Sequence, residues 1–565
     1  MTRYCWVEPE ENALSRFDLT DSPLMCAILE QRGFSSADDV AEFLTPELKN
    51  LSDPYLLPDM HLAVQRISDA INAGQTIGIF GDYDADGVTS TATLTRALAL
   101  LGGNVRTYLP HRINDGYGLN RGAIDRMVAD GVSLLVALDC GTSDVDEIVY
   151  AQSHGLSTVV VDHHHIHPGQ APLPDTAFVS AQRADSVFPF RELAAVGVTY
   201  YLVRALLGEE RAATFLPLVA LGTVADVVPL IGENRTLVQH GLRRFARDGV
   251  AGLQSLAREA GIDASSVSSY HCGYVLGPRI NAAGRMADPD IALELLLTDD
   301  RQRAAELADQ LGKLNATRQQ RVRSMLAEAE DAVQREGDAL PFLIVGGSGW
   351  SPGLVGLVAG RLTERFYRPS LALSIGEEIS RGSARSIAEF NIVEALDQCS
   401  DLLLEHGGHS QAAGLSVKTS DIPLLEARLI ALARDAFGDE LPQMPVTIDA
   451  ELHGRELSLK TAQLLTLLEP FGAGNPEPRF LLRSVMVRSP RRTRDGKHLQ
   501  LDVETLEGTV ARAIFFDGAS ALPSLMSRGP FDLLVQLKLD HWKSRTRLGV
   551  EVVDYRPAVA LPVGS

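Results

Sequence analysis

Three continuous apolar runs in the first third of the chain each end at an aspartate. The runs span residues 76–80, 134–138 and 158–161, and the aspartates that follow them are Asp82, Asp139 and Asp162. Helix-compatible stretches separate the runs, for example residues 90–101 and 144–153. Unbroken apolar strands divided by helices are typical of a parallel sheet covered on both faces. The pattern therefore predicts an α/β domain built on a parallel sheet.

Residues 299–335 form a long polar stretch that is rich in strong helix formers. Leu307, Leu311 and Leu314 recur near helical spacing within it, which predicts one long helix with a single apolar face. The alternation of strand and helix patterns returns after residue 340, where Ser351 and Pro352 are good start signals for an apolar helix. A second α/β lobe is therefore expected after the long helix.

Beyond residue 439 the pattern becomes β-like. Short runs at 480–482, 499–503 and 531–537 are apolar or alternating, with turn residues between them. Strands of this kind fit an OB-type β-barrel, which is a common platform for single-stranded nucleic acid. The basic and aromatic residues that such a groove would use are Arg488, Arg491, Arg492, Arg494, Lys497 and the cluster at 541–545. A solubilising loop is the alternative interpretation of the arginine run.

A length of 565 residues exceeds what one hydrophobic core usually organises, so several domains are expected. The hydrophobic content of 45% and the charged content of 22% are those of a folded soluble protein. The expected segments are an N-terminal segment at 1–55, a catalytic domain at 56–240, a connecting helical region at 241–336, a second α/β lobe at 337–438 and a barrel at 439–565. The first segment is expected to contribute packing, not chemistry.

Composition also bounds the setting in which the protein works. No apolar run approaches the ~18 residues of a membrane span, and no basic region followed by an apolar one comes after Met1. We therefore expect a cytoplasmic protein with no membrane partner. The five cysteines lack Cys-X-X-Cys spacing, so neither a zinc ribbon nor a disulfide framework is indicated. The net charge of −21 argues against general coating of nucleic acid, although a local basic channel and bound cations are compatible with it.

Carboxylates gather at the predicted carboxyl edge of the parallel sheet. Asp82, Asp84 and Asp86 occupy alternating positions after the first run, and like charges are costly to bring together without a cation. Ligands of open parallel sheets bind beyond the carboxyl ends of the strands, so Asp139 and His163 are expected in the same crevice. An ordinary turn of Asp and Gly residues is the alternative for residues 82–87, and a polar loop is the alternative for the Asp-His-His segment that begins at Asp162. Both segments together favour a divalent metal site.

One further aspartate is surrounded by apolar residues. Asp226 lies within residues 218–230, where an unpaired charge would be expensive. A cap at a helix end is the common alternative explanation. Ligation of a metal is the more specific one.

The order of these segments resembles the DHH phosphoesterase superfamily, in particular its RecJ branch of single-strand-specific DNA exonucleases. The metal motifs that carry the resemblance are Asp-Tyr-Asp-Ala-Asp-Gly at 82–87, the strand-end Asp139, Asp-His-His at 162–164, and Val-Ala-Asp-Val-Val-Pro-Leu at 224–230. Further segments similar to the RecJ pattern lie at 110–119, 277–286, 349–356, 381–386 and 407–414. Chance would explain one such segment, but not all of them in the family's order.

The resemblance implies a DHH catalytic lobe, a connecting helix, a DHH-associated lobe and an OB barrel. It implies hydrolysis of single-stranded DNA from the 5′ end to mononucleotides, in DNA repair and recombination. The substrate-binding positions it implies are Arg112, Ser383 and Arg385 around the 5′ phosphate, Arg279 near the scissile bond, and Gly407, Gly408 and His409 in the lobe that closes over the substrate. A monomer that works beside a single-strand-binding protein and a RecQ-type helicase is expected.

Ligand chemistry suggests the metals. Carboxylates with one or two imidazoles suit Mn²⁺ or Mg²⁺, and two such ions can activate a water and stabilise a leaving oxygen. The expected ligands of the two ions are Asp84, Asp86, Asp139, His163 and Asp226, with Asp82 as a further ligand or supporting group. His164 is expected to contact the phosphate or to orient a ligand.

Two other functions remain open at this stage. One is a DHH enzyme acting on short oligonucleotides or cyclic dinucleotides, although such chains look shorter, and the OB-like C-terminal region and the long helix between the lobes argue against it. The other is a non-catalytic binding protein with a broken metal site, although every ligand position is filled here. ATP hydrolysis is not supported, because the Gly-rich segment at 346–356 lacks the Gly-Lys-Ser/Thr ending of a P-loop.

Overall fold

The computed structural model describes residues 4–8, 22–112, 115–166, 169–336, 340–438, 440–527, 529–542 and 545–558. Backbone contacts divide the chain into two compact units. The barrel unit comprises Met1–Glu47, Gln443–Phe471 and Asn475–Ser565, and the two-lobe unit comprises Leu48–Pro442 and Gly472–Gly474. The barrel unit thus joins segments from both ends of the chain.

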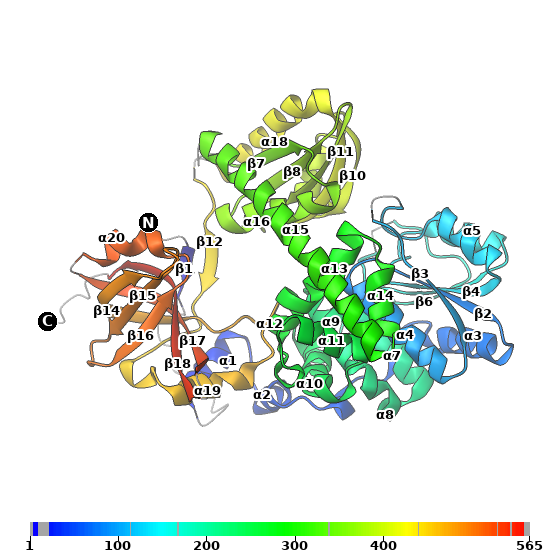
Figure 1. Cartoon of the computed structure of the whole chain (residues 1–565), viewed down its shortest axis with the longest axis horizontal. Helices are drawn as coiled ribbons and strands as arrows, with labels where there is room; N and C mark the ends of the chain where they lie inside the picture. The colour runs from blue at the N-terminus through cyan, green and yellow to red at the C-terminus, as the bar shows by residue number, and fades with distance from the viewer. Residues whose placement is uncertain are drawn as a thin grey trace. The chain divides into compact units, whose positions relative to one another are not determined.

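The first lobe of the two-lobe unit is built on a five-stranded, wholly parallel sheet with the order β3-β2-β4-β5-β6 (Figure 1). Its strands are β2 (Thr76–Gly81), β3 (Asn104–Tyr108), β4 (Val132–Leu138), β5 (Ser157–Val161) and β6 (Thr176–Val179). The parallel sheet that the apolar runs predict is confirmed, and the three runs form the adjacent strands β2, β4 and β5. Their carboxyl ends therefore lie side by side at one edge of the sheet.

Helices cover both faces of this sheet. They are α3 (Met60–Asn72), α4 (Ala85–Leu100), α5 (Arg121–Ala129), α6 (Val145–Ser153) and α7 (Ala195–Leu207). Leu134 and Val136 of β4 belong to the core that includes α3, α4 and α7, whereas Leu135 and Ala137 belong to the core that includes α5 and α6. Successive residues of a strand point to opposite faces, so a strand buried on both faces has to be apolar throughout.

A helical region follows the sheet of the first lobe. Its helices are α8 (Glu209–Ala212), α9 (Leu216–Ala225), α10 (Gly232–Asp248), α11 (Ala251–Glu259), α12 (Ser269–His271), the π-helix η5 (Cys272–Leu276), α13 (Gly277–Met286), α14 (Asp290–Leu297) and α15 (Arg301–Glu336). The long helix expected at 299–335 is α15. Leu307 and Leu311 in its first half pack into the core of the first lobe, and Met325 and Ala329 in its second half pack into a core of the second lobe.

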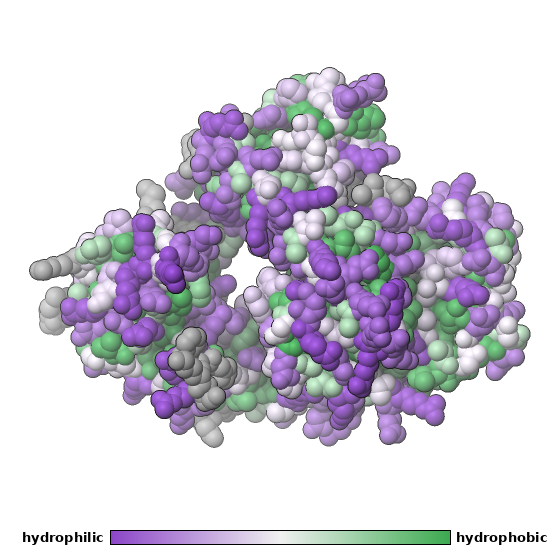
Figure 2. Space-filling model, viewed as in Figure 1, coloured by the Kyte–Doolittle hydropathy of each residue, from purple (hydrophilic) through white to green (hydrophobic). Residues whose placement is uncertain are grey.

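The opposite side of α15 is polar, and the face of the molecule over this helix is mostly hydrophilic (Figure 2). Among the described residues, no helix combines the length and the apolar character that a membrane span requires.

The second lobe is a five-stranded mixed sheet with the order β10-β11-β9-β8-β7. Its elements are β7 (Leu343–Ser348), α16 (Pro352–Phe366), β8 (Ser370–Ile375), β9 (Ile379–Arg385), α17 (Ile392–Asp397), β10 (Leu403–His409), β11 (Ala412–Lys418) and α18 (Ile422–Phe437). The start signals at Ser351 and Pro352 are confirmed, because α16 begins at Pro352 with Ser351 at the N-cap position.

The barrel unit contains a closed five-stranded barrel, in which β14-β15-β16-β18-β17 is completed by pairing of β14 with β17. Its strands and helices are β13 (Ala450–Glu451), α19 (Leu459–Leu465), β14 (Phe480–Arg492), β15 (Leu499–Glu504), β16 (Val510–Phe515), α20 (Leu522–Leu525), β17 (Pro530–Trp542) and β18 (Arg545–Pro557). The expected OB-type barrel is confirmed.

The start of the chain completes this barrel unit. β1 (Tyr4–Val7) pairs in parallel with β12 (Met444–Thr447), and α1 (Pro23–Gln31) and α2 (Ala37–Leu44) follow it. Leu29 of α1 and Phe43 of α2 share one hydrophobic core with the barrel strands. Local sequence patterns gave no sign of this long-range association.

We expect Leu29→Ala to lower the free energy of unfolding of the barrel unit by about 2–5 kcal/mol, because Leu29 is fully buried in the barrel core. Calorimetric unfolding of the full chain measures this. Gln31→Ala, on the exposed side of the same helix, is the control and should change stability by less than about 0.5 kcal/mol. Equal shifts for the two variants would show that α1 is not part of the barrel core.

Candidate metal centre

The loop after β2 brings Asp82, Asp84 and Asp86 to the carboxyl edge of the parallel sheet. Asp84 is the N-cap of α4, and its Oδ1 accepts hydrogen bonds from the backbone N–H groups of Asp86 at 2.9 Å and Gly87 at 3.1 Å. A helix N-terminus favours a carboxylate through its unpaired amides and its dipole. Gly87 is required, because a Cβ there would lie 2.5 Å from the carbonyl oxygen of Asp82.

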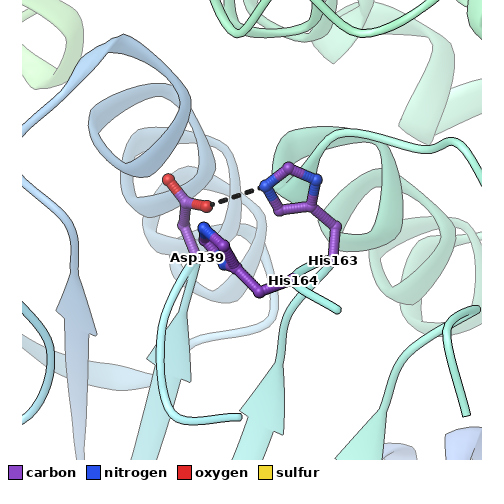
Figure 3. Close-up of side chains that lie close together, drawn as sticks. All are labelled: Asp139, His163 and His164. Carbon is purple, nitrogen blue, oxygen red and sulfur yellow. Dashed lines mark ion pairs between the residues drawn. The ribbon is translucent and has the colours of Figure 1, made fainter. Parts of the chain in front are cut away.

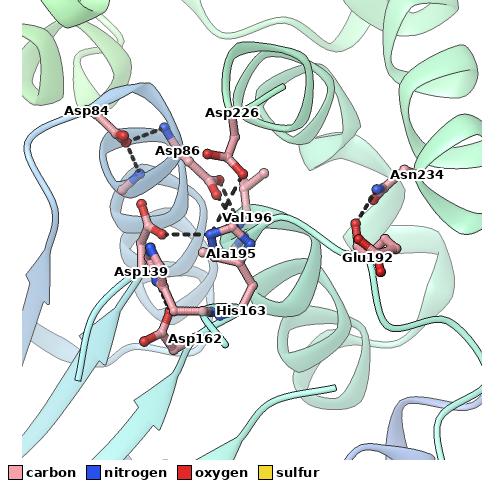
Figure 4. A network of polar contacts seen from close by, with 12 residues as sticks. Asp84, Asp86, Asp139, Asp162, His163, Glu192, Ala195, Val196, Asp226 and Asn234 are labelled. Carbon is pink, nitrogen blue, oxygen red and sulfur yellow. Dashed lines mark hydrogen bonds and ion pairs between the residues drawn. The ribbon is translucent and has the colours of Figure 1, made fainter. Parts of the chain in front are cut away.

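Asp86 points from α4 toward the start of a second helix, α7. Its two carboxylate oxygens accept hydrogen bonds from the backbone N–H groups of Ala195 at 2.7 Å and Val196 at 2.8 Å (Figure 4). Burial, together with the charge of Asp84, raises the pKa of Asp86 to about 7. The amides hold the carboxylate in place, but their hydrogen bonds offset only part of the cost of burying its charge.

Asp139 and His163 meet at the ends of β4 and β5. The Oδ1 atom of Asp139 lies 3.4 Å from Nε2 of His163, and the same Nε2 lies 3.7 Å from Oδ2 of Asp226 at the end of α9 (Figures 3 and 4). Asp139 has a φ of 61°, and Val227, next to Asp226, has a φ of 65°. Positive φ values are costly for residues other than glycine and often mark functional sites.

Asp162 is fully buried beneath the two histidines and orients them. Its carboxylate accepts hydrogen bonds from the backbone N–H groups of Thr142 at 3.1 Å and His163 at 2.7 Å, and its Oδ1 lies 2.7 Å from Nδ1 of His164. Burial opposes ionisation, but the hydrogen bond and charge of His164 outweigh it and hold the pKa of Asp162 below its usual range. The same hydrogen bond raises the pKa of His164 to about 9 against the effect of burial.

The potential ligand atoms form overlapping groups. Within each group they lie within 4.8 Å of one another, and the groups are Asp82, Asp84 and Asp139; Asp86, His163 and Asp226; and Asp139, His163 and His164. The residues expected from the sequence to be catalytic, Asp82, Asp84, Asp86, Asp139, His163, His164 and Asp226, therefore lie in one cluster.

The donor set fits divalent cations. The Oδ1 atom of Asp82 is buried without a hydrogen-bond partner among the described residues. Burial, with the charges of neighbouring carboxylates, raises the pKa of Asp82, Asp139 and Asp226 well above the ordinary value. Such a cluster is unfavourable when ionised and becomes favourable around cations that bind carboxylate oxygens and imidazole nitrogens.

A cluster of arginines lies beside the carboxylates. The guanidinium of Arg112 lies 5.0 Å from the ring centroid of Tyr83, and Nη1 of Arg285 donates to the carbonyl oxygen of Gly353 at 3.1 Å. Arg385 donates to Oγ of Ser383 at 3.0 Å. Burial, together with the charge of Arg112, lowers the pKa of Arg285 to about 9, and the same two causes lower the pKa of Arg385.

In the part of the chain that the structure describes, Arg112, Arg285 and Arg385 form no ion pair with a carboxylate. Buried guanidinium groups that repel one another are a favourable site for an anion, and phosphate suits their paired donors. Arg112, Ser383 and Arg385, expected together from the sequence, are close in space here.

Arg279 is engaged differently from these arginines. Its Nε donates to Glu259 of α11 at 2.7 Å, and its Nη1 donates to the carbonyl oxygen of Val275 at 2.9 Å. Its contact with a strand near the scissile bond stays a prediction.

Gly407, Gly408 and His409 end β10 in a hairpin with β11. Gly408 has a φ of 146°, and a Cβ there would overlap the carbonyl oxygen of Ala412, so the hairpin itself requires a glycine. A Cβ on Gly407 would meet no atom within 4 Å, which leaves room for another molecule. The role of this hairpin toward a substrate stays a prediction, and Lys543 and Ser544 of the basic cluster near the C-terminus lie outside the described residues.

Several supporting residues were not assigned a role from the sequence. Oδ1 of Asn281 in α13 accepts a hydrogen bond from the N–H of Ala85 at 2.7 Å and so holds the aspartate loop. Tyr117 OH lies 3.2 Å from Nε2 of His164 and donates to the carbonyl oxygen of Asp139 at 3.2 Å. Both belong to motif segments visible in the sequence, but only the fold shows what they contact.

Three family models match the chain. They are the DHH family, N-terminal domain, at residues 76–223; the DHHA1 domain at 339–435; and the RecJ OB domain at 448–554. Among curated proteins, the chain is 35% identical to the single-stranded-DNA-specific exonuclease RecJ of Bacillus subtilis, with 94% of this chain and 68% of the relative covered. It is 35% identical to the protein of the same name from Escherichia coli, with 86% and 87% covered.

Solved structures agree with these matches. The crystal structure of RecJ from Thermus thermophilus in complex with Mn²⁺ has a TM-score of 0.82 and 29% identity, over 99% of this chain and 80% of that one. The Mg²⁺ complex from the same organism has a TM-score of 0.78 and 30% identity, over 100% and 80%.

We expect the metal-free protein to lose stability as the pH rises from about 5 to 8. The pKa of Asp86 is about 7 in the folded protein against an ordinary 3.8. The folded protein therefore binds the proton of Asp86 more tightly than the unfolded chain does, and the stability that this proton contributes is present at low pH and is lost as the pH rises through 7. Mn²⁺ at one fixed concentration, a hundred times its Kd at pH 8, should raise the Tm at pH 8 by about 5 °C or more, and the same concentration should give a smaller gain at pH 5, where protons compete for the ligands.

Thermal unfolding with and without Mn²⁺ measures both effects. Asp139→Asn, which removes one charge from the cluster, should raise the metal-free Tm at pH 8 and reduce the gain from Mn²⁺. A metal-free Tm that rises from pH 5 to pH 8, or an unchanged Tm with Mn²⁺, would contradict the assignment.

Proposed function

The chain belongs to the family of the single-stranded-DNA-specific exonuclease RecJ, and on that premise we propose that it hydrolyses single-stranded DNA from the 5′ end to mononucleotides in DNA repair and recombination. The observation that carries the proposal is that overlapping carboxylate and imidazole groups lie beside arginines that have no carboxylate partner among the described residues. The carboxylates and imidazoles suit metal-assisted hydrolysis, and the arginines suit recognition of a phosphate.

The proposed ligands of two Mn²⁺ or Mg²⁺ ions are Asp84, Asp86, Asp139, His163 and Asp226, with Asp82 as a further ligand. When bound, the ions supply Lewis-acid activation of the attacking water and neutralise charge on the scissile phosphate. Asp162 orients His163 and His164 through hydrogen bonds, and the amides of α7 fix Asp86. These contacts hold the site in position before the substrate arrives.

His164 is proposed to contact the scissile phosphate as a cation. In the metal-free protein the hydrogen bond with Asp162 raises the pKa of His164, which favours the protonated imidazole, and Tyr117 OH lies 3.3 Å from Nδ1 and 3.2 Å from Nε2 of the ring. An imidazolium beside the phosphate can donate a charge-assisted hydrogen bond to an oxygen on which negative charge develops.

The polarity of attack is proposed to come from the arginine cluster. Arg112, Ser383 and Arg385 can hold a terminal 5′ phosphate, which places the first internucleotide linkage near the carboxylates. Arg279, Gly407, Gly408 and His409 are proposed as further substrate contacts. A pocket that requires a chain end explains removal of terminal nucleotides in preference to internal cleavage.

We further propose that the protein acts in the cytoplasm as a monomer, beside a single-strand-binding protein and a RecQ-type helicase that supply its substrate. A DHH enzyme specific for dinucleotides and a non-catalytic scaffold are less favoured. The described barrel strands offer an additional binding platform, and the carboxylate cluster retains every expected ligand.

Asp84→Ala or His163→Ala should reduce the Mn²⁺-dependent degradation of a labelled single strand by about a thousandfold or more, because each removes a proposed ligand. Asp146→Ala, which removes an exposed carboxylate of α6, is the control and should leave the rate unchanged. Circular dichroism verifies that the variants fold. Near-normal turnover by a folded Asp84→Ala or His163→Ala protein would refute the metal assignment.

Arg385→Ala should lower the preference for a 5′-phosphorylated end over a 5′-hydroxyl end by about 10- to 100-fold, since a charge-assisted phosphate contact is lost. Rates on matched strands that differ only at this end measure the preference. Arg434→Ala, at an exposed arginine of α18, is the control. Unchanged discrimination in Arg385→Ala would place the terminal phosphate elsewhere.

A further inference from the structure

Two exposed tyrosines form a stacked pair in the helical region of the first lobe. The ring centroids of Tyr270 and Tyr274 lie 5.1 Å apart with an interplanar angle of 27°, and the two residues are 62% and 69% exposed. Large aromatic residues exposed to this degree leave much apolar surface in water. The pair contributes little to the core and is available to another molecule.

The pair lies on the helical run that leads into α13. Tyr270 belongs to α12, Tyr274 belongs to the π-helix η5, and α13 begins directly after η5 (Figure 1). A π-helical turn is rare and frequently occurs at functional sites. This run packs tightly on α9, since a Cβ on Gly277 would lie 2.9 Å from Cβ of Ala225, the residue before Asp226. The tyrosines are thus fixed to the element that presents one proposed ligand.

The run through α13 also contacts the other two parts of the site. Asn281 holds the aspartate loop through Ala85, and Arg285, one turn later, belongs to the arginine cluster. At about 1.5 Å per residue, the backbone of Arg285 lies about 6 Å from that of Asn281 along the helix axis. Tyr274 and Tyr270 lie at most about 10 and 16 Å from Asn281 in the opposite direction, because the α-helical rise is an upper bound for the π-helical residues between them. The order along the backbone of this helical run is therefore the tyrosine pair, then Asn281 beside the aspartate loop, then Arg285 of the arginine cluster.

We propose that Tyr270 and Tyr274 form a stacking platform for bases of the DNA strand on the 3′ side of the scissile phosphate. The inference rests on the proposed function, because a strand whose 5′ phosphate lies among the arginines and whose first linkage lies at the carboxylates continues toward the tyrosines. At about 3.4 Å per stacked nucleotide, the platform lies roughly three to five nucleotides beyond the metal cluster.

Stacking on this platform supports selection of single strands. An aromatic face can stack on any base, so it adds affinity without sequence preference. Bases of a duplex are already stacked and paired, so they gain nothing from the tyrosines.

Tyr274→Ala and Tyr270→Ala test the proposal with Mn²⁺ and a single strand of about twelve nucleotides. Each should raise KM about tenfold and leave kcat nearly unchanged, in line with the loss of one stacked base. Tyr274→Phe, which keeps the ring, should restore the wild-type KM, whereas Tyr274→Leu, which keeps only apolar volume, should not. Tyr55→Ala is the control, because Tyr55 is also exposed and stacks on His61 at 4.2 Å.

A dinucleotide ends before it reaches the platform, so its hydrolysis should be equal in wild type and Tyr274→Ala. An abasic site placed in turn at positions two to seven of the longer strand should raise the wild-type KM at one or two positions, and Tyr274→Ala should be insensitive at those positions. Equal KM values in wild type and both alanine variants, no position sensitive to an abasic site, or failure of Tyr274→Phe to restore KM would each overturn the platform.

These outcomes are separable from failure of the proposed function. If wild-type protein with Mn²⁺ does not degrade the single strand, the function itself fails. If wild type is active and the tyrosine variants match it on every substrate, only the platform fails. The tyrosine pair would then be a surface for another kind of partner.

Discussion

The mutual repulsion of buried carboxylates is the constraint on which the centre of this structure depends. Asp82, Asp86 and Asp139 are almost fully buried at one edge of the sheet, with Asp84 and Asp226 beside them. Backbone amides at the start of α4 and α7 relieve part of the cost for Asp84 and Asp86. The remaining cost of ionising the carboxyl groups appears as raised pKa values of Asp82 and Asp139. Protonation or bound cations can offset this cost. Repulsion between the carboxylates therefore favours the binding of divalent cations at this site.

A complementary constraint acts a short distance away. Arg285 and Arg385 are partly buried near Arg112, and burial together with repulsion between the guanidinium groups lowers their pKa values. A bound anion would relieve the repulsion between these guanidinium groups, as bound cations would relieve the repulsion between the carboxylates. The net charge of −21 is therefore a poor guide to phosphate binding, since the charges that matter are separated into two small clusters of opposite sign. A nucleic-acid enzyme can be acidic overall when its contacts are local.

Helix α13 links the two clusters. A glycine at position 284 lets it approach Tyr83 closely, Asn281 holds the aspartate loop, and Arg285 reaches the second lobe at Gly353. The long helix α15 packs against α13 and enters the cores of both lobes. Rigid elements of this kind position catalytic groups better than loops do. The distance between the arginine cluster and the carboxylate cluster is thus set by helices, which suits the proposed removal of one nucleotide at a time.

The sequence by itself determined the parallel sheet, the long helix, the second lobe and the barrel, because strands buried on both faces must be apolar and amphipathic helices must repeat every 3.6 residues. It also indicated the candidate metal ligands, since acids after adjacent parallel strands converge at one edge. Only the tertiary structure decided the pairing of β1 with β12, the orienting role of Asp162, the engagement of Arg279 by Glu259, and the stacking of Tyr270 on Tyr274. These depend on contacts between distant or differently oriented segments, whose geometry no local pattern of hydrophobic and polar residues encodes.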